Sequence, residues 1–559
     1  MKRQTNLIKR LALALLAALL AFTLTACGGS GGSTGKVMSQ EDAQKELNAL
    51  LSKIKVSSVN APLDIYDDSS TANKVLADIS TFPITVSGNG AINIEIAAAT
   101  EMSSDSPDDW LNVVARKFNR EDHRLNGKTV TVSVRKITSG EVVTYMIDGN
   151  YRPDVYIPSN YAWGKMLESY FEVTTLTDRL IGNTAGILMK DTTQKAFLEK
   201  YKEVTVGNVL NATLAGDLVF AYTNPYTSST GLNILSAMLN YFDPNDPVSE
   251  NASAKLIEYQ RQSPPVAYTT GVLRNQAAKG IIDAMVMEEQ AFVNTPELKG
   301  YQYTPAGIRH DHPVYTFDYV SQAKQEAAKL FVEYCLTDEC QKLADERGFN
   351  RHNDYVGQDP GMTGTDYFAA QKVWKQNKNG GRPIAAVFVA DVSGSMSGTP
   401  LRSLQTSLIN SAGYIGSENY IGLLSFSDNV TINLPIGEFD AMQRAKFSGA
   451  VKQLSANGST ATYDAVLAAL NLLLEKQREN PDVKPMMFVL SDGEQNVGNS
   501  LSRIKGIVQA FGIPIYTIGY NLSNTKELSE LAQLNEATLI NSTSDDVVNQ
   551  LRNLFNTQL

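Results

Sequence analysis

The chain has 559 residues, of which 43% are hydrophobic, and it carries a formal net charge of −10 at pH 7. A hydrophobic share of this size excludes wholesale disorder and is sufficient for two or three packed domains. The acidic balance, without a concentrated basic stretch, excludes a typical nucleic-acid-binding protein.

The first residues have the pattern of an export signal. Four basic residues precede the apolar run Leu11–Leu24, which is too short to span a bilayer comfortably. The following Leu24–Cys27, L-T-A-C, matches the bacterial lipobox, in which cleavage precedes the cysteine and the thiol is acylated. We therefore expect residues 1–26 to be a lipoprotein signal peptide and Cys27 to carry a lipid such as palmitate. An ordinary signal peptide with an incidental cysteine is the alternative.

Residues 27–90 are predicted to form a tether and an N-terminal helical extension. Gly28–Gly35 is rich in glycine and serine, as flexible tethers are. Gln40–Ile54 has leucines at helical spacing and is expected to be an amphipathic helix. Beyond the signal, the sequence has no stretch long and apolar enough to span a bilayer, so only the lipid is expected to contact the membrane. The protein is thus expected to be exported and held at the outer face of the bacterial cell membrane or in the periplasm.

Residues 91–356 alternate between strand-like and helix-like patterns, which predicts an α/β module with a parallel sheet. The expected strands are Ile92–Ala98, Thr129–Lys136, Pro153–Ile157, Leu218–Tyr222, Ile281–Met287 and Tyr315–Val320. The expected helices are Asp109–Arg120, Leu232–Tyr241 and Ser321–Tyr334.

This module resembles the two-lobed extracellular solute-binding proteins of ABC importers, with their type II periplasmic-binding fold. The resemblance is carried by D-V-Y-I-P-S at Asp154–Ser159, by T-N-P-Y-T-S-S-T-G-L at Thr223–Leu232 and by the order of the surrounding elements. It implies two chain crossings between the lobes, which we expect near Asp217–Thr223 and His310–Phe317.

The resemblance also implies a solute cleft between the lobes. The hydroxyl side chains expected to line this cleft are those of Thr100, Ser103, Ser104, Ser228, Ser229 and Thr230. The alternative is that these hydroxyls only cap helices. No lysine or arginine adjoins these loops in the sequence, which argues against tight capture of a free multivalent anion.

Two pairs of side chains in this module have other interpretations. Cys335 and Cys340 lie five positions apart in a helical region, so a disulfide between them requires a helix break, and two buried thiols are the alternative. His310 and His312 lack an obvious third metal ligand, and a structural role or a place at a hinge is favoured.

Residues 357–383 are polar and rich in glycine, which predicts a linker with one helix at Tyr367–Asn377. Residues 384–559 then form a second α/β unit. Its expected strands are Ile384–Ala390, Tyr420–Ser427, Val430–Leu434, Met486–Ser491, Pro514–Ile518 and Ala537–Ile540. Its expected helices are Leu401–Ile415, Asp440–Gln453, Thr462–Lys476, Ser500–Phe511, Lys526–Ala532 and Asp545–Phe555. Most strands are continuous apolar runs, which indicates a central sheet covered on both faces.

Oxygen-bearing side chains follow two of these buried strands. Asp391, Ser393 and Ser395 follow Ile384–Ala390, and Asp492 follows the strand that ends at Ser491. Ligands of α/β sheets bind beyond the carboxyl ends of the strands, so these oxygens are expected at one sheet edge. Hard oxygen donors suit Mg²⁺ or Mn²⁺, with Ca²⁺ as an alternative. The competing interpretation is that the serines cap the next helix and the aspartate shapes a turn.

Three segments of this unit resemble the von Willebrand factor A domain, which has a Rossmann-like fold with a mainly parallel sheet. They are D-V-S-G-S-M at Asp391–Met396, G-S-T-A-T-Y-D-A at Gly458–Ala465 and V-L-S-D-G at Val489–Gly493. The resemblance implies a metal-ion-dependent adhesion site (MIDAS) whose ligands are Asp391, Ser393, Ser395, Thr460 and Asp492. It also implies that the bound ion takes an acidic side chain from a protein or matrix ligand.

We therefore expect a lipid-anchored extracytoplasmic binding protein with an adhesion site and a solute-binding-like module. An ABC-importer substrate-binding lipoprotein with an accessory metal-binding domain is the alternative. The chain lacks a G-x-S-x-G elbow, an H-E-x-x-H zinc helix and a P-loop, so it is not expected to be an enzyme. A metal-dependent hydrolase would need a general base near the ion, and none stands out.

Overall fold

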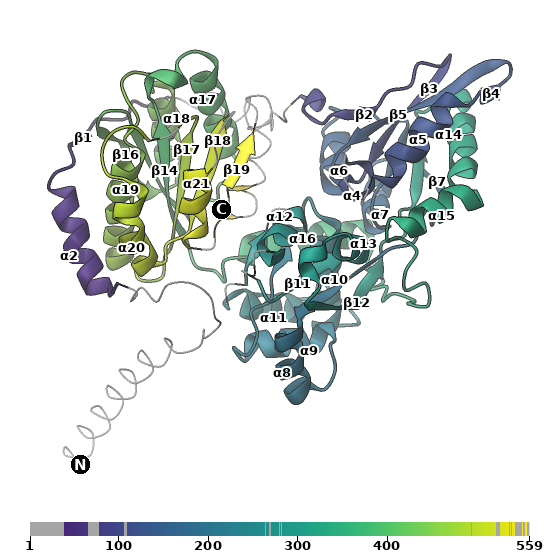
Figure 1. Ribbon diagram of the computed structural model, residues 1–559, viewed down its shortest axis with the longest axis horizontal. Helices are drawn as coiled ribbons and strands as arrows, with labels where there is room; N and C mark the ends of the chain where they lie inside the picture. The colour runs from purple at the N-terminus through teal and green to yellow at the C-terminus, as the bar shows by residue number, and fades with distance from the viewer. Residues whose placement is uncertain are drawn as a thin grey trace.

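The computed structural model describes two α/β units (Figure 1). The described residues are 38–64, 76, 78–104, 109–493 except 263, 268, 269, 279 and 281, 495–542 except 521–525, 536 and 538, and 551, 554, 555, 558 and 559. The predicted signal peptide and Cys27 lie outside these residues. Among the helices that the structure describes, none combines the length and the apolar character that a membrane crossing requires.

The unit that contains the C-terminal part of the chain is built on one seven-stranded sheet. Its strand order is β1-β16-β15-β14-β17-β18-β19, and β15 and β16 form the antiparallel pair in an otherwise parallel sheet. This confirms the mainly parallel sheet expected from the sequence. The strands are β1 (Val56–Ser58), β14 (Ile384–Asp391), β15 (Tyr420–Phe426), β16 (Val430–Glu438), β17 (Lys484–Ser491), β18 (Ile515–Tyr520) and β19 (Leu539–Ser542).

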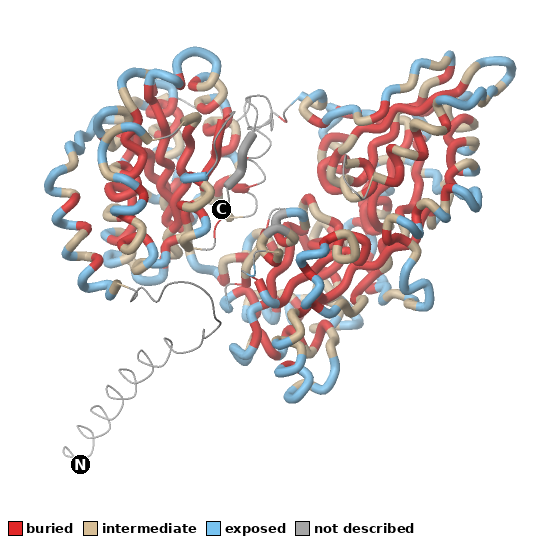
Figure 2. Tube along the Cα trace, in the orientation of Figure 1, coloured by how far each residue is buried: buried red, intermediate tan, exposed pale blue. Residues whose placement is uncertain are grey.

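The central strand β14 explains why these strands have apolar runs rather than alternating patterns. Every residue of β14 is buried (Figure 2). Val387 and Val389 join one core cluster, while Ala386 and Phe388 join the other. The first cluster lies under α19 and α20, and the second under α17 and α18. The helices are α2 (Gln40–Leu51), α17 (Thr399–Ala412), α18 (Ala441–Lys452), α19 (Thr462–Glu479), α20 (Leu501–Phe511) and α21 (Lys526–Gln533), with the short 3₁₀ helix η3 at Gly394–Met396. The predicted helix Asp545–Phe555 lies largely outside the described residues.

The N-terminal extension is part of this same unit. Helix α2 buries Ala43, Leu47 and Leu50 in the core cluster shared with α19 and α20. Strand β1 adds to the sheet beside β16, where Val56 is the register partner of Val430. The first and the last described elements therefore belong to one unit, and the two-lobed module lies between β1 and β14 in sequence.

Replacing Leu47 by alanine is expected to destabilise this unit by about 2–5 kcal/mol, because a fully buried leucine leaves a cavity. The exposed Ala49→Gln exchange on the same helix serves as the matched control and should change stability little. Differential scanning calorimetry of the full chain measures both. Equal melting of the two variants would show that α2 is only a stalk.

The two-lobed module has one sheet system in each lobe. Lobe 1 contains the sheet β2-β5-β3-β6-β13-β7, with β4 paired to β5, and lobe 2 contains the sheet β11-β8-β12 and the pair β10-β9. The strands of lobe 1 are β2 (Ile84–Val86), β3 (Ile92–Ala98), β4 (Arg124–Leu125), β5 (Lys128–Lys136), β6 (Val155–Ile157), β7 (Val173–Thr177) and β13 (Val314–Phe317). Those of lobe 2 are β8 (Thr184–Lys190), β9 (Tyr222–Thr223), β10 (Val266–Ala267), β11 (Ala284–Glu288) and β12 (Tyr301–Arg309).

The helices of the module pack around these sheets. Those of lobe 1 are α4 (Thr100–Ser103), α5 (Trp110–Arg120), α6 (Ser139–Ile147), α7 (Ala162–Glu168), α14 (Gln322–Cys335) and α15 (Asp338–Glu346), with the 3₁₀ helix η1 at Ile79–Thr81. Those of lobe 2 are α8 (Asp191–Tyr201), α9 (Val206–Leu214), α10 (Ser229–Phe242), α11 (Glu250–Gln260), α12 (Thr270–Ala278) and α13 (Glu289–Val293), with η2 at Pro296–Leu298.

The chain crosses between the lobes after β7 and again after β12. The crossing predicted near Asp217–Thr223 is wrong, because Ala221 bridges Met285 inside lobe 2 and β9 pairs with β10 there. The first crossing lies instead at residues 178–183, just before β8. Strand β8 has only a short apolar run, whose pattern does not separate a buried strand from a helix segment. The second crossing, at residues 310–313, lies where the sequence predicted it.

The segment 357–383, predicted to be a linker, holds the helix α16 (Gly364–Asn377). Gly364 lies so close to α7 of lobe 1 that an added Cβ would approach the Lys165 carbonyl oxygen to 2.1 Å. Farther along, Trp374 is fully buried and donates a hydrogen bond of 2.8 Å to the hydroxyl of Tyr222 in lobe 2. Helix α16 thus packs on both lobes and leads within a few residues to β14.

The two cysteines of the module are free and buried. Helix α14 ends at Cys335 and α15 begins at Asp338, so the helix break that a disulfide would require is present. The structure thus has the two buried thiols that were the alternative to a disulfide.

Candidate functional site

The two predicted carboxylate ligands lie at one edge of the C-terminal sheet. Asp391 is the last residue of β14, and Asp492 follows the last residue of β17. These strands are parallel neighbours in which Ala390 pairs with Leu490. Parallel pairing therefore brings both carboxylates to the carboxyl ends of adjacent strands.

Two serine hydroxyls connect the carboxylates. The hydroxyl oxygens of Ser393 and Ser395 lie 3.0 Å apart, and the Ser395 hydroxyl donates to Asp492 Oδ1 at 2.9 Å. The backbone N–H of Ser393 donates to Asp391 Oδ1 at 2.8 Å. Four of the five predicted ligands thus form a continuous group of hard oxygen donors.

Thr460 is brought to this group by contacts of its loop. The Gly394 N–H donates to the Gly458 carbonyl at 2.9 Å, which joins the loop of Thr460 to the loop of the serines. The Thr460 N–H donates to Asn496 Oδ1 at 2.8 Å, so Asn496 holds the threonine in place. Asn496 was missed in the sequence, because it lies after the V-L-S-D-G segment in a loop without a regular pattern.

The charges of the two aspartates lack compensation from the described part of the chain. Asp391 is fully buried, and neither Asp391 nor Asp492 forms an ion pair with a described lysine, arginine or histidine. Burial raises the pKa of Asp391, and the nearby charge of Asp492 raises it further, while burial also raises the pKa of Asp492. Ser491 stabilises the buried carboxylate by donating to Asp391 Oδ2 at 2.5 Å.

This donor set fits a divalent cation. Two aspartates close together, with hydroxyl oxygens around them, supply the hard ligands that Mg²⁺ and Mn²⁺ prefer, and a dication would remove the uncompensated charge. The described residues contain no group of three or more His, Cys, Asp or Glu side chains able to hold a metal, so a site here relies on its hydroxyls.

Metal binding at this edge is expected to weaken on mild acidification. Protons compete with the ion for Asp391 and Asp492, and the raised pKa of each makes this competition begin at a higher pH than at exposed aspartates. Without the ion, the stability of the fold depends on pH in the opposite direction. A raised folded-state pKa contributes stability below the unfolded pKa, and this contribution is lost as the pH rises through the folded pKa.

Melting curves with Mg²⁺ and with chelator, recorded from mildly acidic to neutral pH, measure this dependence. The gain in melting temperature from Mg²⁺ should shrink as the pH falls. A gain that stays constant over this range would show that the raised pKa values do not govern binding.

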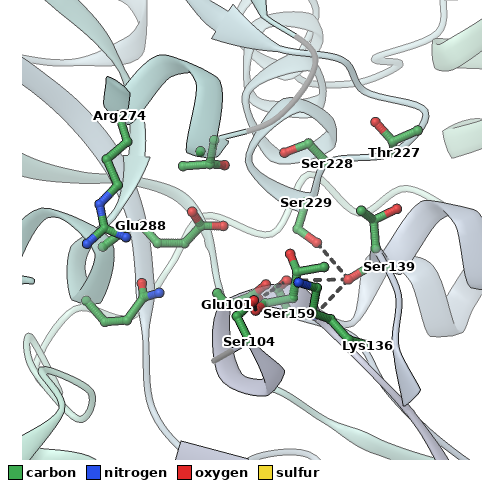
Figure 3. Close-up of a pocket in the computed structure, with 16 residues that line it drawn as sticks. Glu101, Ser104, Lys136, Ser139, Ser159, Thr227, Ser228, Ser229, Arg274 and Glu288 are labelled. Carbon is green, nitrogen blue, oxygen red and sulfur yellow. Dashed lines mark hydrogen bonds between the residues drawn. The ribbon is translucent and has the colours of Figure 1, made fainter. Parts of the chain in front are cut away.

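A second candidate site is the cavity between the two lobes of the solute-binding-like module (Figure 3). It has a volume of about 370 Å³ and is lined by residues of both lobes. Beside it, Ser229 of lobe 2 donates to the hydroxyl of Ser139 in lobe 1 at 3.1 Å. The cavity therefore lies where the two lobes meet, next to both crossing segments.

The structure places four of the six predicted cleft residues on this cavity, and these are Thr100, Ser104, Ser228 and Ser229. Ser103 is fully buried and donates to the Ala99 carbonyl at 2.8 Å. The hydroxyl of Thr230 lies 2.8 Å from that of Thr223 and is used inside lobe 2. Both hydroxyls are thus bonded inside their own lobes, although neither forms the helix cap that was the alternative to solute binding.

The charge of the cavity differs from the prediction. Lys136 from the end of β5 and Arg274 from α12 both line it, together with Glu101 and Glu288. The argument that no lysine or arginine adjoins the predicted loops therefore does not carry over to the folded cavity. It considered neighbours in sequence, whereas folding brings the ends of a distant strand and a distant helix to the cavity.

Two family descriptions match the chain, one for each unit. Residues 386–556 match the von Willebrand factor type A domain, and residues 99–350 match a bacterial extracellular solute-binding protein family. Both families are of the binding type. Each match falls within the boundaries of one of the two units described above.

The similar proteins named here each match part of the chain. A segment of 150 residues is 29% identical to inter-alpha-trypsin inhibitor heavy chain H3 of Bos taurus, covering 25% of this chain and 16% of that protein's length. A von Willebrand factor type A structure from Catenulispora acidiphila covers 31% of this chain and 42% of its own, at 17% identity and a TM-score of 0.29. Iron-bound HitA from Pseudomonas aeruginosa covers 52% of this chain and 99% of its own, at 13% identity and a TM-score of 0.38. With TM-scores this low, the assignment rests on the family matches.

Proposed function

We propose a function for a chain that joins a bacterial extracellular solute-binding module to a von Willebrand factor type A domain. The protein is an extracytoplasmic binding protein whose type A domain binds a protein or matrix ligand through a divalent cation. Its solute-binding module holds a small solute in the interlobe cavity. The lipid on Cys27 attaches the protein to the outer face of the membrane.

The observation that carries this proposal is the oxygen cluster at the sheet edge. Asp391, Ser393, Ser395, Thr460 and Asp492 would hold Mg²⁺ or Mn²⁺, and the sequence around them resembles the adhesion site of type A domains. When bound, such an ion supplies a positive centre with open positions for an acidic side chain of a partner. The five side chains would hold the ion at the carboxyl edge of the sheet. Among the described residues at this cluster, none has the arrangement of a general base, and the proposed role is binding.

The path of the chain favours an arrangement in which the sheet edge that carries Asp391 and Asp492, here called the metal edge, faces away from the membrane. Strand β1 is parallel to β16, and β16 is antiparallel to β15, so β1 starts at the metal edge and runs away from it. Helix α2, which leads into β1, therefore begins near the opposite edge. Strand β14 also begins at that opposite edge, where the chain arrives from α16. A tether from Cys27 would thus reach the domain at the end remote from Asp391.

An importer receptor with an accessory metal domain is the second candidate function. The cavity between the lobes favours it, because a receptor of this kind closes two lobes around its solute. In this case the type A domain would localise the receptor or regulate it.

Capture of membrane-embedded partners separates the two functions. The purified chain is immobilised and incubated with detergent-solubilised cell-envelope proteins of the producing bacterium, in Mg²⁺ or in chelator. A partner retained only in Mg²⁺ supports the metal-bridged function. Retention of importer subunits in both conditions, with no Mg²⁺-dependent partner, would favour the importer receptor.

A further inference from the structure

We propose that the solute of the interlobe cavity is a small organic acid that also carries hydroxyl or amino groups. Its carboxylate would lie against Lys136 and Arg274, and its hydrogen-bond donors would meet Glu101 and Glu288. This inference rests on the proposed function in one respect, namely that the cavity binds a solute. It goes further in naming the chemical class and the residues that select it.

Each lobe contributes one cation and one carboxylate to the cavity. Lobe 1 supplies Lys136 and Glu101, and lobe 2 supplies Arg274 and Glu288. In Figure 3 Lys136 lies on one side with Ser139, and Arg274 lies on the other side near Glu288. A solute in the cavity therefore lies near positively and negatively charged side chains of both lobes.

The two carboxylates already have partners behind the cavity wall. His312 Nε2 lies 3.1 Å from Glu101 Oε1, and His310 Nδ1 lies 3.6 Å from Glu288 Oε1. Both histidines are fully buried on the segment that crosses between the lobes. The negative charges of the wall are thus held in place by the protein itself.

Unlike Glu101 and Glu288, Lys136 has no charged partner among the described residues. The ammonium group of Lys136 forms no hydrogen bond or ion pair with any residue that the structure describes, although it faces the cavity. Arg274 is oriented by a hydrogen bond of 2.8 Å to the Asn294 carbonyl and by another to the Thr295 hydroxyl. An anionic group of the solute would therefore complement Lys136 and Arg274.

Buried hydrogen-bonding groups at the cavity also favour a solute with acceptor oxygens. Gln290 is fully buried and lines the cavity, and its Oε1 accepts from Asn183 at 3.1 Å. Its Nε2 has no hydrogen-bond partner in the described part of the structure, and neither has the hydroxyl of Thr227. A buried donor left unpaired is unfavourable, and the acceptor oxygens of a carboxylate would satisfy it.

The carboxylates and the size of the cavity exclude a free inorganic oxyanion as the best ligand. A dianion would lie beside both Glu101 and Glu288, whose like charge opposes it. A cavity of about 370 Å³ also has room for an organic body in addition to the anionic group. Hydroxyl or amino groups on that body can donate to the two glutamates, which a dianion without hydrogens cannot do.

Titration calorimetry on the full chain tests the proposal with matched probes. D-Gluconate is compared with sorbitol, and L-serine with ethanolamine, because each pair differs only in the carboxylate. Sulfate and molybdate are the inorganic probes. We expect at least one acid to bind, about tenfold or more tightly than its uncharged or decarboxylated counterpart, since charge-assisted hydrogen bonds are lost in the latter.

Two variants locate the binding. Lys136→Gln should weaken binding of that acid about tenfold or more, whereas Lys128→Gln, at the exposed opposite end of β5, should leave it unchanged. Thermal melting of both variants checks that they are folded. Tighter binding of sulfate or molybdate would overturn the chemical class. Acid binding that is insensitive to Lys136→Gln would overturn the place assigned to the carboxylate. Either result would leave a solute-binding function. No binding by any probe would overturn both the chemical class and the solute-binding function.

Discussion

Replacing Asp391 by asparagine is expected to remove the stabilisation that the chain gains from Mg²⁺ or Mn²⁺. For a site that is filled at a hundred times its dissociation constant, this gain is about 2.7 kcal/mol. Asparagine keeps the shape of the side chain and can still accept from the Ser393 N–H, so the metal-binding charge is the main loss. Melting temperatures with metal and with chelator measure the effect.

The same variant has a second expected signature without metal. Burial and the charge of Asp492 raise the pKa of Asp391, so its ionised form destabilises the metal-free fold at neutral pH. Asp391→Asn should therefore be as stable as the natural chain in chelator, or more stable. Asp440→Asn at the exposed N-terminus of α18 is the control, because asparagine caps helices as well as aspartate does. Full metal-induced stabilisation in Asp391→Asn would contradict the assigned site.

Replacing Trp374 by alanine is expected to destabilise the two-lobed module by about 3–5 kcal/mol. The indole is fully buried in the core cluster of that module, and its Nε1 donates to the Tyr222 hydroxyl. Its ring also lies 6.1 Å from that of Tyr226, centroid to centroid, next to the loop that carries Ser228. Calorimetric unfolding of the full chain measures the loss.

Lys372→Ala on the same helix is the matched control for Trp374→Ala. Lys372 is exposed, and its replacement should change stability by no more than about 0.5 kcal/mol. If both variants unfolded like the natural chain, α16 would be a free linker instead of part of the module. A solute titration of Trp374→Ala would then show unchanged affinity as well.

The oxygen cluster at the sheet edge could be predicted from sequence because its geometry follows from local patterns. Asp391 and Asp492 each stand directly after a buried apolar run, and parallel strands bring their carboxyl ends together. The hydroxyls of Ser393 and Ser395 lie within four residues of Asp391, so their nearness needs no long-range folding. The position of Asn496, which holds Thr460, depends on a loop conformation that no pattern encodes.

The solute cleft could be predicted only in part. The hydroxyl-rich loops after β3 and β9 were visible as polar turns that follow buried strands. Lys136, Arg274 and Gln290 were not, because each reaches the cavity from the end of a different element. Ser103 and Thr230 show the reverse error, since a hydroxyl in the right loop can point into its own lobe.

The place of the N-terminal extension depended on tertiary packing alone. The leucine spacing in Gln40–Ile54 predicts an amphipathic helix, and α2 confirms one at Gln40–Leu51. The pattern does not say which core its apolar face joins. Strand β1, only three residues long, has exposed side chains and becomes a strand by pairing with β16.

The most direct test of the metal site is anomalous diffraction from crystals of the full chain grown with Mn²⁺. The account predicts one strong anomalous peak at the carboxyl edge of β14 and β17. That peak should lie within ligand distance of oxygens from Asp391, Ser393 and Ser395, and be lost in Asp391→Asn. A Mn²⁺ peak only elsewhere in the chain, or an ordered edge without one at saturating Mn²⁺, would contradict the account.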